Sequence, residues 1–139
     1  MFKKTLQISI IEDDLVSANL IQNLILDNYN KVNISIYPEY NFNPEKLKKS
    51  DIIVLDHDLD NKTGLDLLRD LNKIKRKKKS NIVVVSGQSN PEVVGKYYDH
   101  KIFNYIIKSD KFQPELIKTL DYLISEIKTF GLGYKKIVH

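Results

Sequence analysis

The stretch DIIVLD, residues 51–56, places four consecutive apolar residues between two aspartates. A short apolar run bounded by polar residues is typical of a strand that is buried on both faces of a parallel sheet. Two other stretches have the same form, LQISII at residues 6–11 and NIVVVS at residues 81–86. Together, the three stretches predict the interior of an α/β sheet.

Segments with a helical spacing of apolar residues alternate with these strand-like runs along the chain. Such alternation predicts an α/β fold, a doubly wound five-stranded parallel sheet with helices on both faces. The order 2-1-3-4-5, the flavodoxin-like (βα)5 arrangement, is adopted from known doubly wound folds. The expected strands are residues 6–11, 32–37, 51–56, 81–86 and 101–107, and the helices begin near residues 16, 45, 64, 91 and 115, the second covering only residues 45–49.

The length and composition favour one globular domain. The chain has 139 residues, of which 42% are hydrophobic and 29% charged, and residues 1–127 carry the whole strand and helix pattern. Residues 128–139 form either a flexible tail or an extra packed segment. Because there is no cysteine, disulfides, thiolate metal sites and a catalytic cysteine are excluded. No export signal or membrane-spanning run is found, so a cytoplasmic location is expected.

The net charge of +4 comes largely from one basic run that follows the third predicted helix. Cations at that position complement the helix dipole and keep a turn solvated. The alternative is a contact with nucleic acid or a membrane surface, but no aromatic residues are interleaved with the cations, and direct nucleic-acid binding is not expected. The run consists of Lys73, Lys75, Arg76, Lys77, Lys78 and Lys79.

Polar residues end four of the five predicted strands: Glu12 and Asp13, then Asp56, Ser86 and Lys108. In the expected strand order the first and third strands are neighbours, so the three carboxylates converge at the carboxyl edge of the sheet. Unit charges about 4 Å apart repel by about 4 kcal/mol at an effective dielectric near 20. A cation would relieve this repulsion, and Mg²⁺ prefers such oxygen ligands.

The expected magnesium ligands are Asp13 and Asp56. Glu12 is expected to hold a metal-bound water, and the backbone carbonyl of Asp58 completes the protein's share of the coordination.

Asp56 is also the expected nucleophile, which would form an aspartyl phosphate. The ammonium of Lys108 and the hydroxyl of Ser86 would stabilise the charge on the transferring phosphoryl group. Gly87, beside Ser86, leaves room for the phosphoryl donor.

These residues resemble the receiver domain of bacterial two-component response regulators over roughly residues 5–127. The resemblance implies a phosphoryl-accepting switch whose partners are a sensor histidine kinase or phosphotransfer protein and a downstream protein. It also implies self-catalysed phosphoryl transfer and autodephosphorylation in place of conventional turnover, and a monomer or a phosphorylation-dependent dimer. The matching residues are the pair Glu12-Asp13, Asp56, Gly64, Ser86-Gly87 and Lys108.

The resemblance further implies an aromatic switch at Tyr105, coupled to the hydroxyl of Ser86. Phosphorylation would draw Ser86 inward, Tyr105 would follow, and the face made by the fourth helix, fifth strand and fifth helix would change. The alternative for Tyr105 is a half-buried strand tyrosine without a switching role. Only about a dozen residues follow residue 127, so either output passes through protein contacts or the chain is an excised receiver.

Several residues depart from the family pattern. Ser109 replaces the proline that usually follows the lysine with a cis bond, so either a trans bond or a strained loop is expected. Asp60 stands where many receivers have proline. Together with Asp58 it either tunes metal affinity and phosphoryl lifetime or is a solvated loop carboxylate. His57 is expected to pack or bond to backbone, and Gln88 either positions a hydrolytic water or is an ordinary loop residue.

Two other functions compete with the phosphoryl-accepting switch. The stretch Asp56-His57-Asp58 resembles the Asp-x-Asp motif of haloacid-dehalogenase-like phosphatases, which would make the chain an aspartate-nucleophile phosphohydrolase. That interpretation leaves Glu12 and Asp13 without a role. The other is an inactive pseudo-receiver that serves as a binding module, suggested by Ser109 and the acidic loop.

Overall fold

The computed structural model describes residues 5–76 and 81–127, and these residues form a central five-stranded sheet. All four strand pairings are parallel, and the order is β2-β1-β3-β6-β7. Since β6 and β7 are the fourth and fifth strands of this sheet along the chain, the predicted order 2-1-3-4-5 is confirmed. The strands are β1 (Leu6–Ile11), β2 (Val32–Tyr37), β3 (Ile52–Leu55), β6 (Ile82–Ser86) and β7 (Asn104–Ile107).

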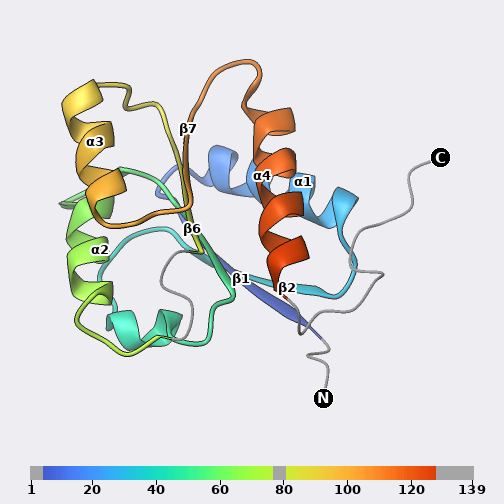
Figure 1. Cartoon of the computed structure of the whole chain (residues 1–139), viewed down its shortest axis with the longest axis horizontal. Coiled ribbons are helices and arrows are strands. Elements are labelled where there is room, and N and C mark those ends of the chain that lie inside the picture. The colour runs from blue at the N-terminus through green and yellow to red at the C-terminus, as the bar shows by residue number, and fades with distance from the viewer. Residues whose placement is uncertain (1–4, 77–80, 128–139) are drawn as a thin grey trace.

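Helices cover both faces of the sheet, with α1 and α4 on one side and α2 and α3 on the other (Figure 1). Alternate residues of each central strand therefore enter different cores. Val54 of β3 packs with α1 and α4, whereas Leu55 packs with α2 and α3. This two-sided burial explains why the central strands are almost continuously apolar. The helices are α1 (Leu15–Asn28), α2 (Gly64–Leu71), α3 (Pro91–Asp99) and α4 (Phe112–Glu126).

The register of β1 and β3 brings their carboxyl ends together. Ile11 pairs with Leu55, the last residue of each strand. The backbone N–H of Asp56 then donates to the carbonyl of Ile11 at 3.0 Å. The acidic residues that follow the two strands consequently leave the sheet side by side.

Polar caps start three helices in the loops at this edge of the sheet. Asp14 accepts from the backbone N–H of Val16 at the start of α1. Thr63 and Asp66 form a capping box at the start of α2. Asn90 caps α3, with Pro91 at its first turn. Each cap satisfies an N–H group that the helix itself leaves unpaired.

The short second helix expected at residues 45–49 is present as a 3-10 helix, η1 (Pro44–Leu47), and not as an α-helix. Asn43 caps this turn, and the N–H of Lys48 bonds to the carbonyl of Glu45, three residues back. So few residues cannot repay the cost of nucleating an α-helix. Leu47 is still buried in the core beside α2.

A two-stranded hairpin that the sequence analysis did not predict follows Asp56. It pairs β4 (Asp58–Leu59) with β5 (Lys62–Thr63), and Asp60 in its turn has a positive φ of 63°. Aspartate tolerates this backbone region better than most residues. The expected third and fifth strands are also shorter than predicted, because residues 51, 56 and 101–103 lie outside them.

Residues 77–79 of the basic run and the segment 128–139 lie outside the described residues, so both predictions about them stay open. Within the described part, Lys73 lies just after α2, as expected, with its ammonium 4.0 Å from Asp70. Among the helices described, none has the length and apolar character needed to cross a bilayer.

Candidate functional site

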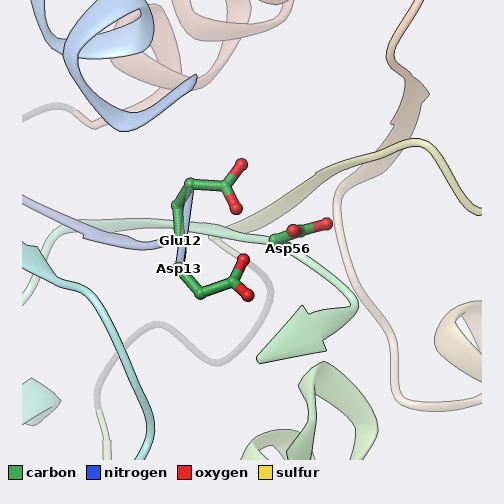
Figure 2. Close-up of side chains that lie close together, drawn as sticks. All are labelled: Glu12, Asp13 and Asp56. Carbon is green, nitrogen blue, oxygen red and sulfur yellow. The ribbon is translucent and has the colours of Figure 1, made fainter. Parts of the chain in front are cut away.

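Three carboxylates meet at the carboxyl edge of the sheet. Glu12 and Asp13 follow β1, Asp56 follows β3, and one carboxylate oxygen from each lies within 4.8 Å of the others. Figure 2 shows the three side chains close together. The convergence predicted from the strand order is therefore present.

The members of this acidic cluster differ in their access to solvent. Glu12 is 1% exposed and Asp56 is 7% exposed, whereas Asp13 faces solvent. Burial and the neighbouring Asp56 carboxyl together raise the pKa of Glu12 to about 8, while Lys108 opposes the shift. When no cation is bound, the acidic cluster therefore takes up a proton at a higher pH than an isolated carboxyl would.

Lys108 reaches the acidic cluster from the opposite side of β3. Its ammonium forms a hydrogen-bonded ion pair with Glu12 and lies 3.8 Å from Oδ2 of Asp56. Its backbone N–H donates to the carbonyl of Ser86 at 2.8 Å, which continues the pairing of β6 and β7. No cis peptide occurs among the described residues, so the bond to Ser109 is trans, one of the two expected outcomes.

Ser86 and Tyr105 lie on neighbouring strands, and both are buried. The hydroxyl oxygen of Ser86 accepts from the N–H of Gln88 at 3.2 Å. The hydroxyl of Tyr105 donates to the carbonyl of Gln88 at 2.6 Å. Burial raises the pKa of Tyr105, so the phenol remains a neutral donor. The side chain of Gln88 caps the next turn by accepting from Asn90.

The residues that follow Asp56 differ in whether their side chains face solvent or the core. Asp58 is exposed on β4, as is Asp60 in the turn. His57 is buried, and its Nδ1 pairs with the hydroxyl of Tyr97 at 2.6 Å. The packing expected of His57 is therefore observed, although its partner is a side chain.

Tyr97 is the residue near the site that the sequence analysis missed. The spacing of Val93 and Tyr97 on α3 already places Tyr97 on an inward face. Its partner, His57, lies 40 residues away in the sequence. No local pattern connects two such residues, because only the packing of α3 against the sheet brings them together.

The donor chemistry of the acidic cluster fits a hard divalent cation. Three carboxylates with one nearby ammonium leave excess negative charge at the carboxyl edge. Oxygen donors of this kind suit Mg²⁺ better than softer metals. The cluster of Glu12, Asp13 and Asp56 is consistent with the metal site of a receiver domain.

The model of the response regulator receiver domain family matches residues 8–121. The chain therefore belongs to the receiver domain family of response regulators, and the resemblance inferred from its motifs is confirmed. No curated protein sequence matches the chain significantly.

Solved receiver structures share the fold at low sequence identity. A CheY-like receiver domain protein from Methanospirillum hungatei JF-1 has a TM-score of 0.73 and 17% identity, covering 89% of this chain and 98% of that one. The phosphorylated cyanobacterial phytochrome response regulator RcpA has a TM-score of 0.74 and 20% identity, covering 88% and 95%. The BeF3-activated N-terminal receiver domain of Klebsiella pneumoniae RstA gives 0.70 and 22%, covering 84% and 97%.

Proposed function

We propose that this receiver accepts a phosphoryl group on Asp56 from a sensor histidine kinase or a phosphotransfer protein, in a magnesium-dependent reaction. The observation that carries the proposal is the position of the Asp56 carboxylate, which lies beside the pair Glu12 and Asp13, with the ammonium of Lys108 3.8 Å from its Oδ2. Family membership supports a kinase as the partner.

Each residue of the proposed site has a distinct task. A carboxylate oxygen of Asp56 forms a bond to phosphorus while the bond from phosphorus to the donor's imidazole nitrogen breaks, and the imidazole leaves. The ammonium of Lys108 neutralises charge on the phosphoryl oxygens, and the hydroxyl of Ser86 donates a hydrogen bond to one of them. In the structure the ammonium of Lys108 forms an ion pair with Glu12, so during the reaction it must contact both Glu12 and the incoming phosphoryl group.

Asp13 and Asp56 are proposed to hold Mg²⁺ directly, with the backbone carbonyl of Asp58, while Glu12 holds a coordinated water. When bound, Mg²⁺ supplies the positive charge that offsets the clustered carboxylates and the incoming phosphoryl group. The burial of Glu12 and the exposure of Asp13 support this division, because a direct ligand open to solvent can take up a hydrated ion.

Exposed apolar residues beside the acidic cluster support docking of a phosphoryl donor. Leu15 and Val16, in the first turn of α1, are 61% and 76% exposed. Apolar side chains so open to solvent suit a protein partner. A helical phosphotransfer surface laid over this turn would bring its histidine toward Asp56.

The proposed output face consists of α3, β7 and α4. Three large side chains on these elements are exposed: Tyr98, Ile107 and Tyr122. The backbone N–H of Tyr105 donates to the hydroxyl of Tyr98 at 3.1 Å, and the hydroxyl of Tyr105 is already turned inward to the carbonyl of Gln88. Phosphorylation would favour this buried position over an outward one, and the downstream protein, or a second copy of the chain, would bind the changed face.

The test is the intact mass of the full chain after incubation with Mg²⁺ and acetyl phosphate. The wild type is expected to gain one phosphoryl group and Asp56→Asn none. Asp51→Asn is the matched control, because Asp51 precedes β3 and is 7% exposed, the same as Asp56. An unmodified wild type that also fails to bind beryllofluoride would contradict the proposal and favour a pseudo-receiver.

A further inference from the structure

Three aromatic rings form a row from the nucleophile toward the proposed output face. The rings of His57 and Tyr97 meet edge to face with centroids 5.6 Å apart. The rings of Tyr97 and Tyr105 do the same at 5.4 Å. All three side chains are buried, so the row is enclosed by the core under α2 and α3.

Hydrogen bonds fix the end of this row that lies nearest the nucleophile. The backbone N–H of His57 donates to Oδ1 of Asp56 at 2.7 Å, which leaves Oδ2 turned toward Lys108. The carbonyl of His57 accepts from the N–H of Gly64 at 2.8 Å. The ring is held through Nδ1 by the hydroxyl of Tyr97. Both the backbone and the side chain of His57 are therefore anchored.

Space for the Tyr97 hydroxyl depends on Gly64, at the start of α2. A Cβ at position 64 would lie 2.5 Å from the hydroxyl oxygen of Tyr97 and 2.6 Å from the backbone oxygen of Asp56. The hydroxyl of Tyr97 thus occupies a tight space beside the backbone of the nucleophile. A phenol in such a buried space is costly unless it has a partner, and His57 is that partner.

We propose that Tyr97 is a positioning residue, which acts through His57 to hold the Asp56 carboxylate and so ties its orientation to helix α3. The inference rests on the proposed phosphorylation of Asp56. The Tyr97 hydroxyl fixes the His57 ring, and the fixed His57 keeps its N–H directed at Oδ1 of Asp56. Because Tyr97 also contacts Tyr105, movement of either tyrosine is transmitted to the nucleophile.

The first test compares two substitutions that each remove one hydroxyl. Tyr97→Phe deletes the partner of His57 and keeps the ring contacts. Tyr29→Phe is the matched control, because the hydroxyl of the buried Tyr29 donates to Asp121 at 2.6 Å, outside the acidic cluster. With acetyl phosphate and Mg²⁺, the phosphorylation rate constant of Tyr97→Phe is expected to fall about three- to tenfold, since one buried hydrogen bond is lost. The rate of Tyr29→Phe is expected to match the wild type.

The second test changes the other partner and separates positioning from packing. His57→Ala is expected to slow phosphorylation as Tyr97→Phe does, and His57→Asn is expected to recover most of the rate, since its amide can reach the Tyr97 hydroxyl. If the two residues act as one unit, the double variant His57→Ala/Tyr97→Phe is no slower than either single variant. The ¹⁵N chemical shift of His57 Nδ1 is expected to differ between Tyr97→Phe and the wild type, because the variant lacks the hydroxyl that pairs with this nitrogen.

The outcomes separate the inference from the proposed function. If the wild type takes up no phosphoryl group, the proposed function fails and the inference fails with it. If the wild type is phosphorylated and folded Tyr97→Phe reacts at the same rate, only the inference fails. Additive rate losses in the double variant, or no recovery in His57→Asn, would also overturn it. Should Tyr97→Phe not fold, the comparison of His57→Ala with His57→Asn decides.

Discussion

Two aspartates flank the same strand, β3, and differ in what surrounds them. Asp51 and Asp56 are each 7% exposed. Asp51, at the amino end, accepts from the N–H of Gln7 at 2.8 Å, and its backbone carbonyl accepts from the side chain of Asn81 at 3.0 Å. Asp56, at the carboxyl end, lies among two more carboxylates, with Lys108 3.8 Å away.

The difference shows how one sheet serves stability at one end and chemistry at the other. At the amino end, the backbone N–H of Gln7 hydrogen-bonds the buried Asp51 carboxylate, which is a structural arrangement. At the carboxyl end, negative charges are brought together with too little compensation from the protein itself. Clustered, perturbed carboxylates of this kind are characteristic of functional sites.

The largest expected effect is a pH dependence that arises only at the carboxyl end. The pKa of Glu12 is raised from 4.5 to about 8, so between these values the folded chain binds a proton that the unfolded chain does not. The free energy of unfolding in EDTA should therefore fall as pH rises through this window, by at most about 5 kcal/mol from this group. Urea unfolding at several pH values measures it.

Glu12→Gln is the control variant for this pH dependence. It should flatten the decline between pH 4.5 and about 8, because the substituted side chain does not titrate, whereas Asp51→Asn should leave the slope unchanged. A slope shared by the wild type and Glu12→Gln would show that another group causes it.

The next largest effect concerns the close packing behind the nucleophile. Gly64→Ala would force a Cβ against Tyr97 and the backbone of Asp56, so we expect a loss of about 1–3 kcal/mol in unfolding free energy. Gly95→Ala in α3 meets nothing within 4 Å and should stabilise the protein by about 0.5–1 kcal/mol through helix propensity. Thermal denaturation compares the pair. Equal changes in unfolding free energy for Gly64→Ala and Gly95→Ala would show that a Cβ at position 64 is not in a tight space.

Magnesium affinity should distinguish the two ends of the sheet directly. Asp13→Asn removes an exposed carboxylate from the acidic cluster, and we expect about 10- to 100-fold weaker Mg²⁺ binding. Asp51→Asn should bind Mg²⁺ as the wild type does, since its carboxylate is committed to Gln7. Isothermal titration calorimetry with MgCl₂ measures both. Wild-type affinity in Asp13→Asn would remove this residue from the proposed ligand set.

The smallest effect is a contrast in sign between the two aspartates. Above the pKa of Glu12, with EDTA present, Asp56→Asn relieves repulsion from two carboxylates and loses attraction to one lysine, so the chain should gain about 1 kcal/mol in stability. Asp51→Asn weakens a charge-assisted hydrogen bond and should lose about 1 kcal/mol. Chemical denaturation near pH 9 tests the pair. Changes of the same sign would mean that the two ends are electrostatically alike.

Most of the fold was predictable because it depends on local patterns. The first two strands, residues 6–11 and 32–37, have the bounds expected from their apolar runs. Helices were expected to begin near residues 45 and 91, and there Asn43 and Asn90 each cap a helix whose first turn holds a proline. The short helix expected at residues 45–49 is of the 3-10 type, which the pattern did not reveal, because so short a segment does not offset the cost of α-helix nucleation.

In the candidate site, too, the features that depend on strand order were predictable, whereas those that depend on side-chain packing were not. Glu12, Asp13 and Asp56 were expected together because parallel strands end at one edge, and strand order alone brings them close. The hairpin of β4 and β5 was not expected, because the stretch from Asp58 to Thr63 carries no apolar alternation. The ion pair of Lys108 with Glu12 was not predicted, because it joins residues that follow β7 and β1 and depends on side-chain positions that no local pattern reveals.

The sequence by itself determined the class of fold, the edge at which the polar residues gather and the family to which the chain belongs. The class of fold follows from the periodicity of neighbouring residues, the edge from a strand order adopted from known doubly wound folds, and the family from the resemblance of the motifs. Only the tertiary structure decided that His57 meets Tyr97, that Gly64 leaves space for this contact, and that burial raises the pKa of Glu12. Such features arise where segments distant in sequence pack together, because burial and partner choice depend on all of them at once.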